Sequence, residues 1–249
     1  MFSLGVLRHA VSMLFYDLWA TVRLTLLPVL IGYGLGYFAA IEIGGVGADN
    51  LLGDRPVVVD GRIMLGLLAY VLVYFAAFCW AAVAWHRYSL LAERPGGLLP
   101  RFDAAQFWAY VGAGFRVGGM GLLMFVPLTI VVGILAPMIG NIWMVMLIMG
   151  IPMLLISARL LRYSLVMPAA ALGKRMTLAE AAAASEGHTG TFVALTVMLW
   201  LIGTLSETDF GGGWAGLILS FLLVWFSLAL GLSVLTTLYG VCVEKRDLS

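Results

Sequence analysis

Residues 63–91 read IMLGLLAYVLVYFAAFCWAAVAWHRYSLL, in which an uncharged apolar run from 63 to 85 passes directly into His-Arg-Tyr-Ser. A run of this length is enough to cross the hydrocarbon core of a membrane as one α-helix, which needs about 20 apolar residues. The tetrapeptide Arg-Tyr-Ser-Leu near its end occurs again at 162–165, also after a long apolar run. The stretch therefore predicts a membrane-spanning helix and raises the question of an internal repeat.

The composition of the whole chain indicates the same lipid environment. Of its 249 residues, 63% are hydrophobic and only 11% are charged, whereas a soluble domain carries about 25% charged residues. Six apolar segments are long enough to span a bilayer as helices, and their continuity disfavours the alternating strands of a barrel. We expect these spans at 24–43, 63–85, 117–136, 142–161, 191–206 and 214–239. The sequence thus predicts an all-α polytopic membrane protein.

The distribution of charge predicts the orientation of the helices, because segments rich in Lys and Arg resist translocation. Of the 14 basic residues, all but Arg55 and Arg62 fall in the N-terminal segment, the second and fourth connections or the C-terminal tail. We therefore expect both termini in the cytoplasm. Residues 2–18 contain no short apolar core followed by a cleavage site, so no cleavable signal peptide is expected. The first outer connection contains VVVD at 57–60, which predicts a short strand at most.

The two Arg-Tyr-Ser-Leu copies, 75 residues apart, belong to a longer correspondence. Each is followed by a cytoplasmic amphipathic segment that opens with a helix-capping pattern, at 103–106 and at 177–180. Residues 4–18 place apolar side chains at helical spacing, which is typical of an interfacial helix. The alternative is a cytoplasmic extension of the first span. Together these features predict three hairpin repeats, each preceded by a cytoplasmic interfacial helix, at 1–95, 96–170 and 171–249.

One segment of the chain carries a family resemblance. It is residues 158–200, which read ARLLRYSLVMPAAALGKRMTLAEAAAASEGHTGTFVALTVMLW. A helix that ends in Arg is followed by a Pro at the membrane exit and by an Ala-rich helix. The positions that carry this pattern are Pro168, Ala181, Ser185, Thr189 and Gly190. The segment resembles a family of uncharacterised six-helix bacterial inner-membrane proteins, which includes the membrane domain fused to some glycerophosphoryl diester phosphodiesterases. The resemblance implies a six-helix fold and no activity, because the phosphodiesterase domain has no counterpart in this chain.

Two sets of residues are predicted to make contacts. The first is a basic and aromatic belt at the inner membrane surface, comprising Arg87, Tyr88, Arg162, Tyr163, Lys174 and Arg175. Arg and Tyr at this level anchor a helix, and the alternative is a groove that holds an anionic lipid head group. The second set has small-xxx-small spacing, which permits close helix packing. It comprises Gly32, Gly36, Gly114 and Gly118.

No residue pattern in the chain predicts a catalytic centre, a metal site or a cofactor. The three histidines, His9, His86 and His188, are far apart in sequence, and none has a second histidine at metal-ligand spacing. A membrane enzyme acting on lipid head groups would need His86, Glu93, Glu186 and His188 to converge on the cytoplasmic face. That is the weakest of the three functions considered.

The favoured function is a non-enzymatic multi-pass inner-membrane protein, a scaffold or accessory subunit that associates with a larger membrane complex, with itself or with lipids. Expected partners include anionic membrane lipids and exclude nucleic acid. The alternative is a transporter or channel for lipids or small apolar solutes. It requires a cavity or lateral opening among the helices, since transported solutes bind inside the bundle.

Overall fold

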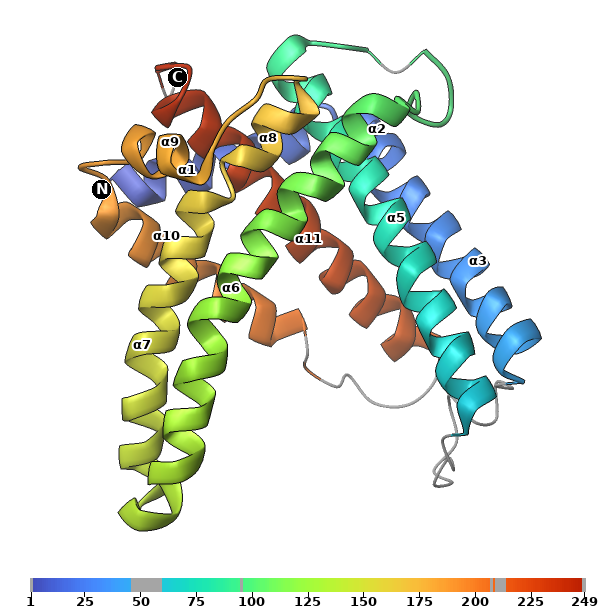
Figure 1. The fold of residues 1–249 in the computed structure, drawn as a ribbon. Coiled ribbons are helices and arrows are strands. Elements are labelled where there is room, and N and C mark those ends of the chain that lie inside the picture. The colour runs from blue at the N-terminus through green and yellow to red at the C-terminus, as the bar shows by residue number, and fades with distance from the viewer. Residues whose placement is uncertain (1, 46–59, 95, 207, 209–213, 248–249) are drawn as a thin grey trace.

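The computed structural model describes residues 2–45, 60–94, 96–206, 208 and 214–247. It is all-helical, with 85% of these residues in helices and no strand among them. Six helices are long and apolar enough to cross a membrane (Figure 1). They are Leu18–Gly44, Gly61–Leu91, Ala104–Ile139, Trp143–Ala171, Thr189–Ser206 and Ile218–Cys242. The predicted all-α class with six candidate spans is confirmed, while residues 57–59 of the possible strand lie outside the described residues.

Each predicted span lies within one continuous helical segment, and most segments extend past it. In chain order these are α1 (Phe2–Tyr16), α2 (Leu18–Thr21), the π-helical turn η1 (Val22–Leu26), α3 (Leu27–Gly44), α5 (Gly61–Leu91), α6 (Ala104–Ile139), α7 (Ile142–Tyr163), α8 (Val166–Ala171), α9 (Leu178–Ala184), α10 (Thr189–Ser206) and α11 (Trp214–Cys242). The extensions arise because hydropathy marks only the part of a helix that crosses hydrocarbon.

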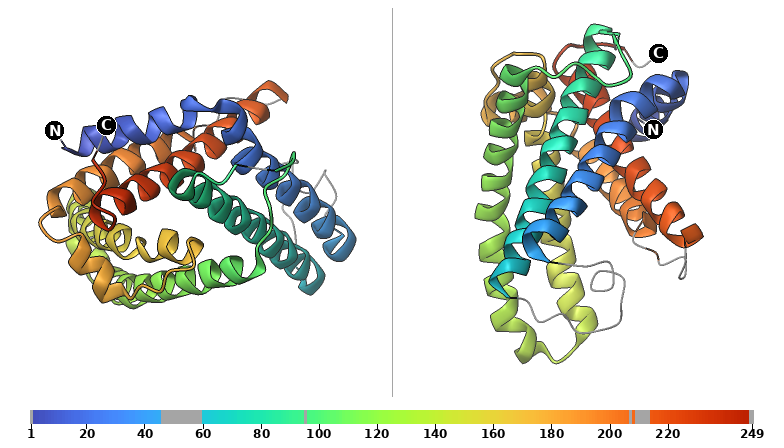
Figure 2. Two further views of the ribbon diagram at one scale, coloured as in Figure 1. Left: turned by 90° about the horizontal axis from the view of Figure 1, so that it is seen from above. Right: turned by 90° about the vertical axis from the view of Figure 1, so that its right-hand side faces the viewer.

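The N-terminal segment forms a helix of its own. α1 ends at Tyr16, and Asp17 caps the next helix by accepting a hydrogen bond from Ala20 N at 2.9 Å. α1 lies beside α11 at one end of the bundle (Figure 2). The residues that α1 buries are one turn apart: Val6, Ala10 and Leu14. The break at Asp17 favours a separate amphipathic helix over an extension of the first span.

The prediction of a separate interfacial helix before the third span is wrong. α6 runs without a break from its cap at Asp103 to Ile139. As the pattern at 103–106 predicts, the Asp103 carboxylate accepts hydrogen bonds from two main-chain N–H groups, at 3.0 and 3.3 Å. Nothing between this cap and the apolar run stops the helix, so the amphipathic start and the span form one element of 36 residues. Such a helix is roughly 54 Å long and exceeds the ~30 Å hydrocarbon core.

The connection between α7 and α10 forms two short helices, α8 and α9. The predicted capping box at 177–180 is present at the start of α9. Glu180 N donates to Thr177 Oγ1 at 3.2 Å, and Thr177 N donates to Glu180 Oε2 at 2.7 Å. These reciprocal bonds satisfy two N–H groups that a helix start leaves free. They also lower the pKa of Glu180 below its ordinary value.

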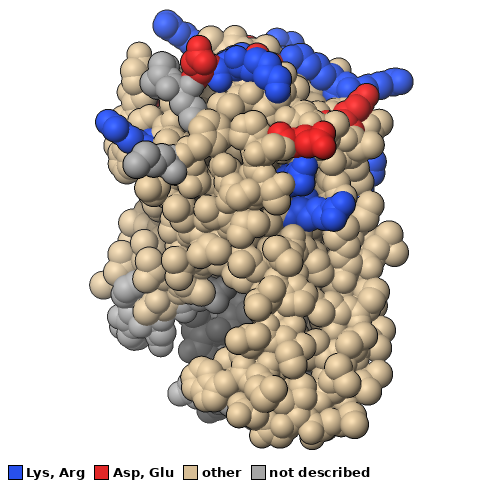
Figure 3. All heavy atoms as spheres, turned by 90° about the vertical axis from the view of Figure 1, so that its left-hand side faces the viewer, with Lys and Arg blue, Asp and Glu red and all other residues tan. Residues whose placement is uncertain are grey.

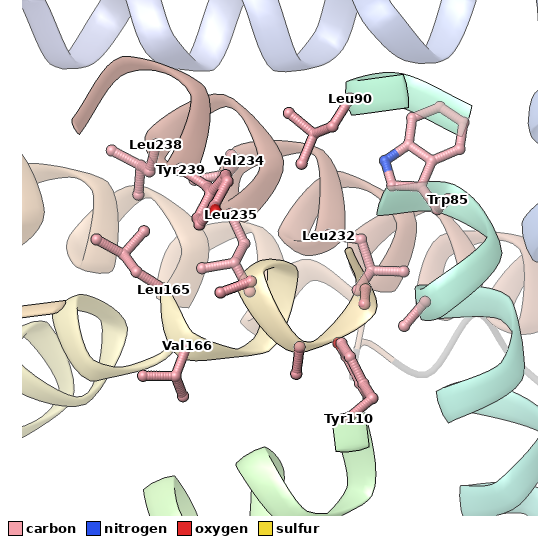
Figure 4. Close-up of a cluster of buried hydrophobic side chains, with 14 of the residues drawn as sticks. Trp85, Leu90, Tyr110, Leu165, Val166, Leu232, Val234, Leu235, Leu238 and Tyr239 are labelled. Carbon is pink, nitrogen blue, oxygen red and sulfur yellow. The ribbon is translucent and has the colours of Figure 1, made fainter. Parts of the chain in front are cut away.

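The hydrophobic core lies at the end of the bundle that holds both termini (Figure 1). Its largest side chains come from helices far apart in sequence, including Trp85 of α5, Tyr110 of α6 and Tyr239 of α11 (Figure 4). On the face in Figure 3, the described Lys, Arg, Asp and Glu residues gather at this same end, above a broad uncharged surface. We call it the charged end.

Away from the charged end, α3 and α5 pack closely while the other helices separate from them (Figures 1 and 2). Gly32 and Gly36 lie where α3 meets α5: a Cβ at Gly32 would overlap Ala77 Cβ, and one at Gly36 would lie 3.1 Å from Tyr70 O. In contrast, Gly118 of α6 has no atom of the chain within 4 Å of an added Cβ.

Candidate functional site

The first Arg-Tyr-Ser-Leu copy ends α5 at the charged end. Arg87 Nε and Nη2 donate to the two carboxylate oxygens of Glu93, at 2.7 and 2.6 Å. Arg87 Nη1 donates to Ala171 O, the last carbonyl of α8, at 3.2 Å. The hydrogen bonds from Arg87 lower the pKa of Glu93 below its ordinary value. Arg87 therefore links α5 to the chain that follows it and to α8.

The second copy reaches α9 in a similar way. Arg162 Nε donates to Ser185 Oγ at 2.9 Å, and Arg162 Nη2 donates to Ala182 O at 2.9 Å. Ser185 is fully buried and donates in turn to Ala181 O at 2.8 Å. Of the 158–200 pattern, Ser185 thus receives this arginine directly, and Ala181 accepts the hydrogen bond from Ser185.

Both arginines bind carbonyls in the last turn of a helix, and a third does the same. Arg246 Nη2 donates to Leu90 O near the end of α5, at 3.0 Å. The last four carbonyls of a helix have no partner within it and carry partial negative charge. Guanidinium groups are suited to such carbonyls because they present several donors in a plane. In this structure Arg87 and Arg162 hold connections in place, besides any contact with lipid.

The tyrosines of the two copies have different surroundings. Tyr88 is half-buried, and its hydroxyl donates to Asp17 Oδ2 at 3.1 Å, which joins α5 to the start of α2. Tyr163 is 9% exposed, and its hydroxyl accepts a hydrogen bond from Arg159 Nε at 3.2 Å. The sequence match therefore does not extend to equivalent contacts.

Lys174 and Arg175 are exposed on the connection between α8 and α9. Lys174 Nζ lies 2.9 Å from Glu244 Oε1, and this hydrogen bond raises the pKa of Lys174 above its ordinary value. Arg246 contacts the other oxygen of Glu244 at 2.7 Å. The C-terminal segment is thereby tied to the α8–α9 connection.

A buried polar cluster at the charged end was missed by the sequence interpretation. His86 is fully buried, and its Nδ1 lies 2.8 Å from Thr236 Oγ1 of α11. Because that hydroxyl donates to Leu232 O at 2.7 Å, it accepts from His86, which places the imidazole proton on Nδ1. The Tyr110 hydroxyl lies 3.5 Å from Nε2. His86 thus joins α5, α6 and α11 as a neutral side chain.

Three cavities of about 430, 510 and 630 Å³ lie at the charged end. Among the predicted belt residues, Arg87 lines the first cavity and Tyr88 the second, while Lys174 and Arg175 line the third. These four belt residues therefore line three different cavities.

In the described part of the chain, no three His, Cys, Asp or Glu side chains lie together as metal ligands would. His86 is bonded to Thr236, and Glu93 to Arg87. The His188 ring packs against Phe2 of α1, with centroids 5.4 Å apart. These three contacts are structural.

Comparisons with protein-family models, with curated proteins and with solved structures find no match to this chain. The resemblance of residues 158–200 to the six-helix inner-membrane family therefore stays a prediction, and the function is argued from the chain's own geometry.

Proposed function

We propose that the protein is a non-enzymatic inner-membrane scaffold or accessory subunit, built from three hairpin units joined at a cytoplasmic, charged end. In this proposal the α6–α7 pair reaches out from the core to contact a transmembrane helix of a partner protein or of a second copy. The observation that carries it is the face that α6 leaves open.

The α6–α7 pair leaves most of its apolar length exposed. In the most apolar 18-residue stretch of the span that α6 forms, only 6% of the residues are buried, and the same share applies to the span that contains α7. The corresponding share is 39% for the first span and 33% for the last. The pair projects from the charged end and diverges from α3 and α5 (Figure 1). Its surface is therefore available to other molecules in the membrane.

One face of α6 favours a protein helix over lipid as the contact. Gly112, Gly119 and Gly133 are exposed, and an added Cβ at each would have no neighbour within 4 Å. Together with Val126 they recur every seven residues, which places them on one face of the helix. Each glycine inside a helix costs about 0.5–1 kcal/mol relative to alanine. In membrane helices such residues permit close approach of a second backbone, which offsets that cost.

The orientation can be tested by cysteine labelling, because Cys79 and Cys242 are only 2% and 1% exposed and should not react. Glu186→Cys at the charged end and Thr208→Cys beyond α10 both replace exposed residues. In intact spheroplasts, a membrane-impermeant maleimide is expected to label Thr208→Cys and to reach Glu186→Cys only after permeabilisation. The reverse pattern would place the charged end outside.

Gly119→Leu is expected to weaken association about tenfold or more and to leave the fold intact. The added side chain has room within the chain, but it blocks the close approach of a second helix, at a cost of about 1–3 kcal/mol. The measurement is native extraction into polymer nanodiscs, followed by mass analysis of the particle and its polypeptides. The wild type should carry a second polypeptide, or a second copy, in stoichiometric amount.

The matched control is Gly34→Leu, which also adds a leucine at an exposed glycine with no neighbour within 4 Å, but on α3. It should leave the association unchanged. A wild-type particle that contains one chain and lipid alone would reject the scaffold, and so would equal association of wild type and Gly119→Leu.

A transporter or channel for lipids or small apolar solutes is the second candidate. It is favoured by the divergence of the α6–α7 pair from α3 and α5 (Figure 2) and by the many exposed apolar side chains on these helices. It predicts flux of a labelled lipid or apolar solute across proteoliposomes that hold the monomer. The scaffold predicts none.

A further inference from the structure

A cavity of about 510 Å³ lies between α1 and the carboxyl end of α5. α1 supplies polar and aromatic side chains to one wall, and the end of α5 with the residues after it supplies the other. The polar and aromatic residues that line it include His9, Ser12, Tyr16, Trp85, Ser89 and Arg94. This cavity is separate from the exposed face of α6 on which the scaffold proposal depends.

Two polar atoms of the cavity's residues are buried without a partner among the described residues. Trp85 Nε1 and Ser89 Oγ are both shielded from solvent and make no hydrogen bond there. Trp85 is itself fully buried. An unsatisfied buried donor costs about 1–3 kcal/mol, and native proteins leave few of them. A ligand that accepts hydrogen bonds would remove this cost.

The donors in the cavity specify an anionic ligand. The indole of Trp85 and the guanidinium of Arg94 can only donate, and the Ser89 hydroxyl can also donate. The nearby carboxylates are already engaged. Asp17 accepts from Tyr88 and from Ala20 N, and Glu93 is paired with Arg87. A ligand with several oxygens and a negative charge, such as a phosphate group, matches these donors.

The position of the cavity favours a lipid as the source of that phosphate. It lies at the end of a 31-residue apolar helix, where a spanning helix meets the head groups. Close in sequence to Tyr16, which lines the cavity, Phe15, Leu18 and Trp19 are 59%, 52% and 61% exposed. Apolar side chains beside a polar cavity would meet the acyl chains of a lipid whose head group entered it.

We propose that this cavity binds the phosphate group of an anionic membrane lipid, with Arg94 as its cation and Trp85 and Ser89 as neutral donors. Arg94 pairs with the phosphate charge, while the buried indole and hydroxyl bind its oxygens. Because α1 forms one wall of the cavity, lipid binding would also hold α1 against α5.

The test is lipid retention by the full chain in detergent, measured by native mass spectrometry while phosphatidylglycerol or phosphatidylcholine is titrated. The wild type should bind one phosphatidylglycerol more tightly than phosphatidylcholine. Arg94→Gln should weaken this binding about tenfold, and Arg94→Lys should restore most of it. Trp85→Phe and Ser89→Ala each remove one donor and should weaken this binding several-fold; only Ser89→Ala does so with little change in shape.

Arg8→Gln is the matched control, since it removes the same charge from an exposed position on α1 outside the cavity. It should leave the binding unchanged, and thermal melting should show that all variants fold. An equal effect of Arg8→Gln, or equal binding of the two lipids, would overturn the proposal. Displacement of the lipid by millimolar inorganic phosphate would keep the phosphate site and reject the lipid as its occupant.

Discussion

Gly66→Leu is expected to separate α5 from α3 and to lower the free energy of unfolding by more than about 3 kcal/mol. An added Cβ at Gly66 would lie 2.6 Å from Gly44 Cα and 2.9 Å from Ala40 O. These are main-chain atoms of α3, which cannot move aside as a flexible side chain can. The two helices must therefore shift apart along a contact that is otherwise extensive. Unfolding by SDS in mixed micelles, followed by circular dichroism, measures the loss.

Gly32→Leu should behave similarly, because its Cβ would overlap Ala77 Cβ across the same contact. Gly34→Leu provides the comparison on α3, since an added Cβ there has no neighbour within 4 Å. Gly34→Leu replaces a glycine inside a helix, so it should leave the free energy of unfolding unchanged or raise it by up to about 1 kcal/mol. Equal stability of the Gly66 and Gly34 variants would show that α3 and α5 do not pack as described.

His86→Ala is expected to lower the free energy of unfolding by about 3 kcal/mol and to weaken helix packing at the charged end. The substitution leaves a cavity at a fully buried position and removes the partner of the Tyr110 hydroxyl. Because the imidazole joins α5, α6 and α11, amide hydrogen exchange should rise in all three helices near the cluster. Thermal unfolding and hydrogen exchange of the purified chain measure both effects.

Thr236→Val tests the contribution of the hydrogen bond apart from that of side-chain packing. It keeps the side-chain shape but leaves His86 Nδ1 without its acceptor, so it should cost about 1–3 kcal/mol. His188→Ala removes a histidine that is only partly buried and should cost less than about 1 kcal/mol. If His86→Ala were no more harmful than His188→Ala, the buried cluster would not stabilise the bundle.

The sequence predicted the helical class and six spans because a long apolar run has few other structures in lipid. Its errors are at helix ends. α6 was divided in two because the amphipathic start and the apolar run differ in composition, although no residue between Asp103 and 117 ends a helix. The change from an amphipathic to an apolar sequence within α6 was interpreted as the boundary between two helices.

The contacts of the charged end were beyond the sequence because they join distant residues. His86 and Thr236 are 150 residues apart, and neither lies in a recognisable motif. Gly66 has no small residue four positions away, so spacing did not reveal its close approach to Gly44. In contrast, the capping box at 177–180, the cap at Asp103 and the pair Gly32 and Gly36 follow local patterns, and these residues lie where such patterns place them.

The proposal that α6 receives a partner helix is tested most directly by crosslinking from its open face in native membranes. A benzophenone maleimide is attached to Gly119→Cys, and to Gly34→Cys as the matched position on α3; Cys79 and Cys242 are buried and should stay unlabelled. After illumination, Gly119→Cys should give one discrete protein adduct that is absent from Gly34→Cys. Lipid adducts alone from Gly119→Cys, or the same adducts from both positions, would contradict the account.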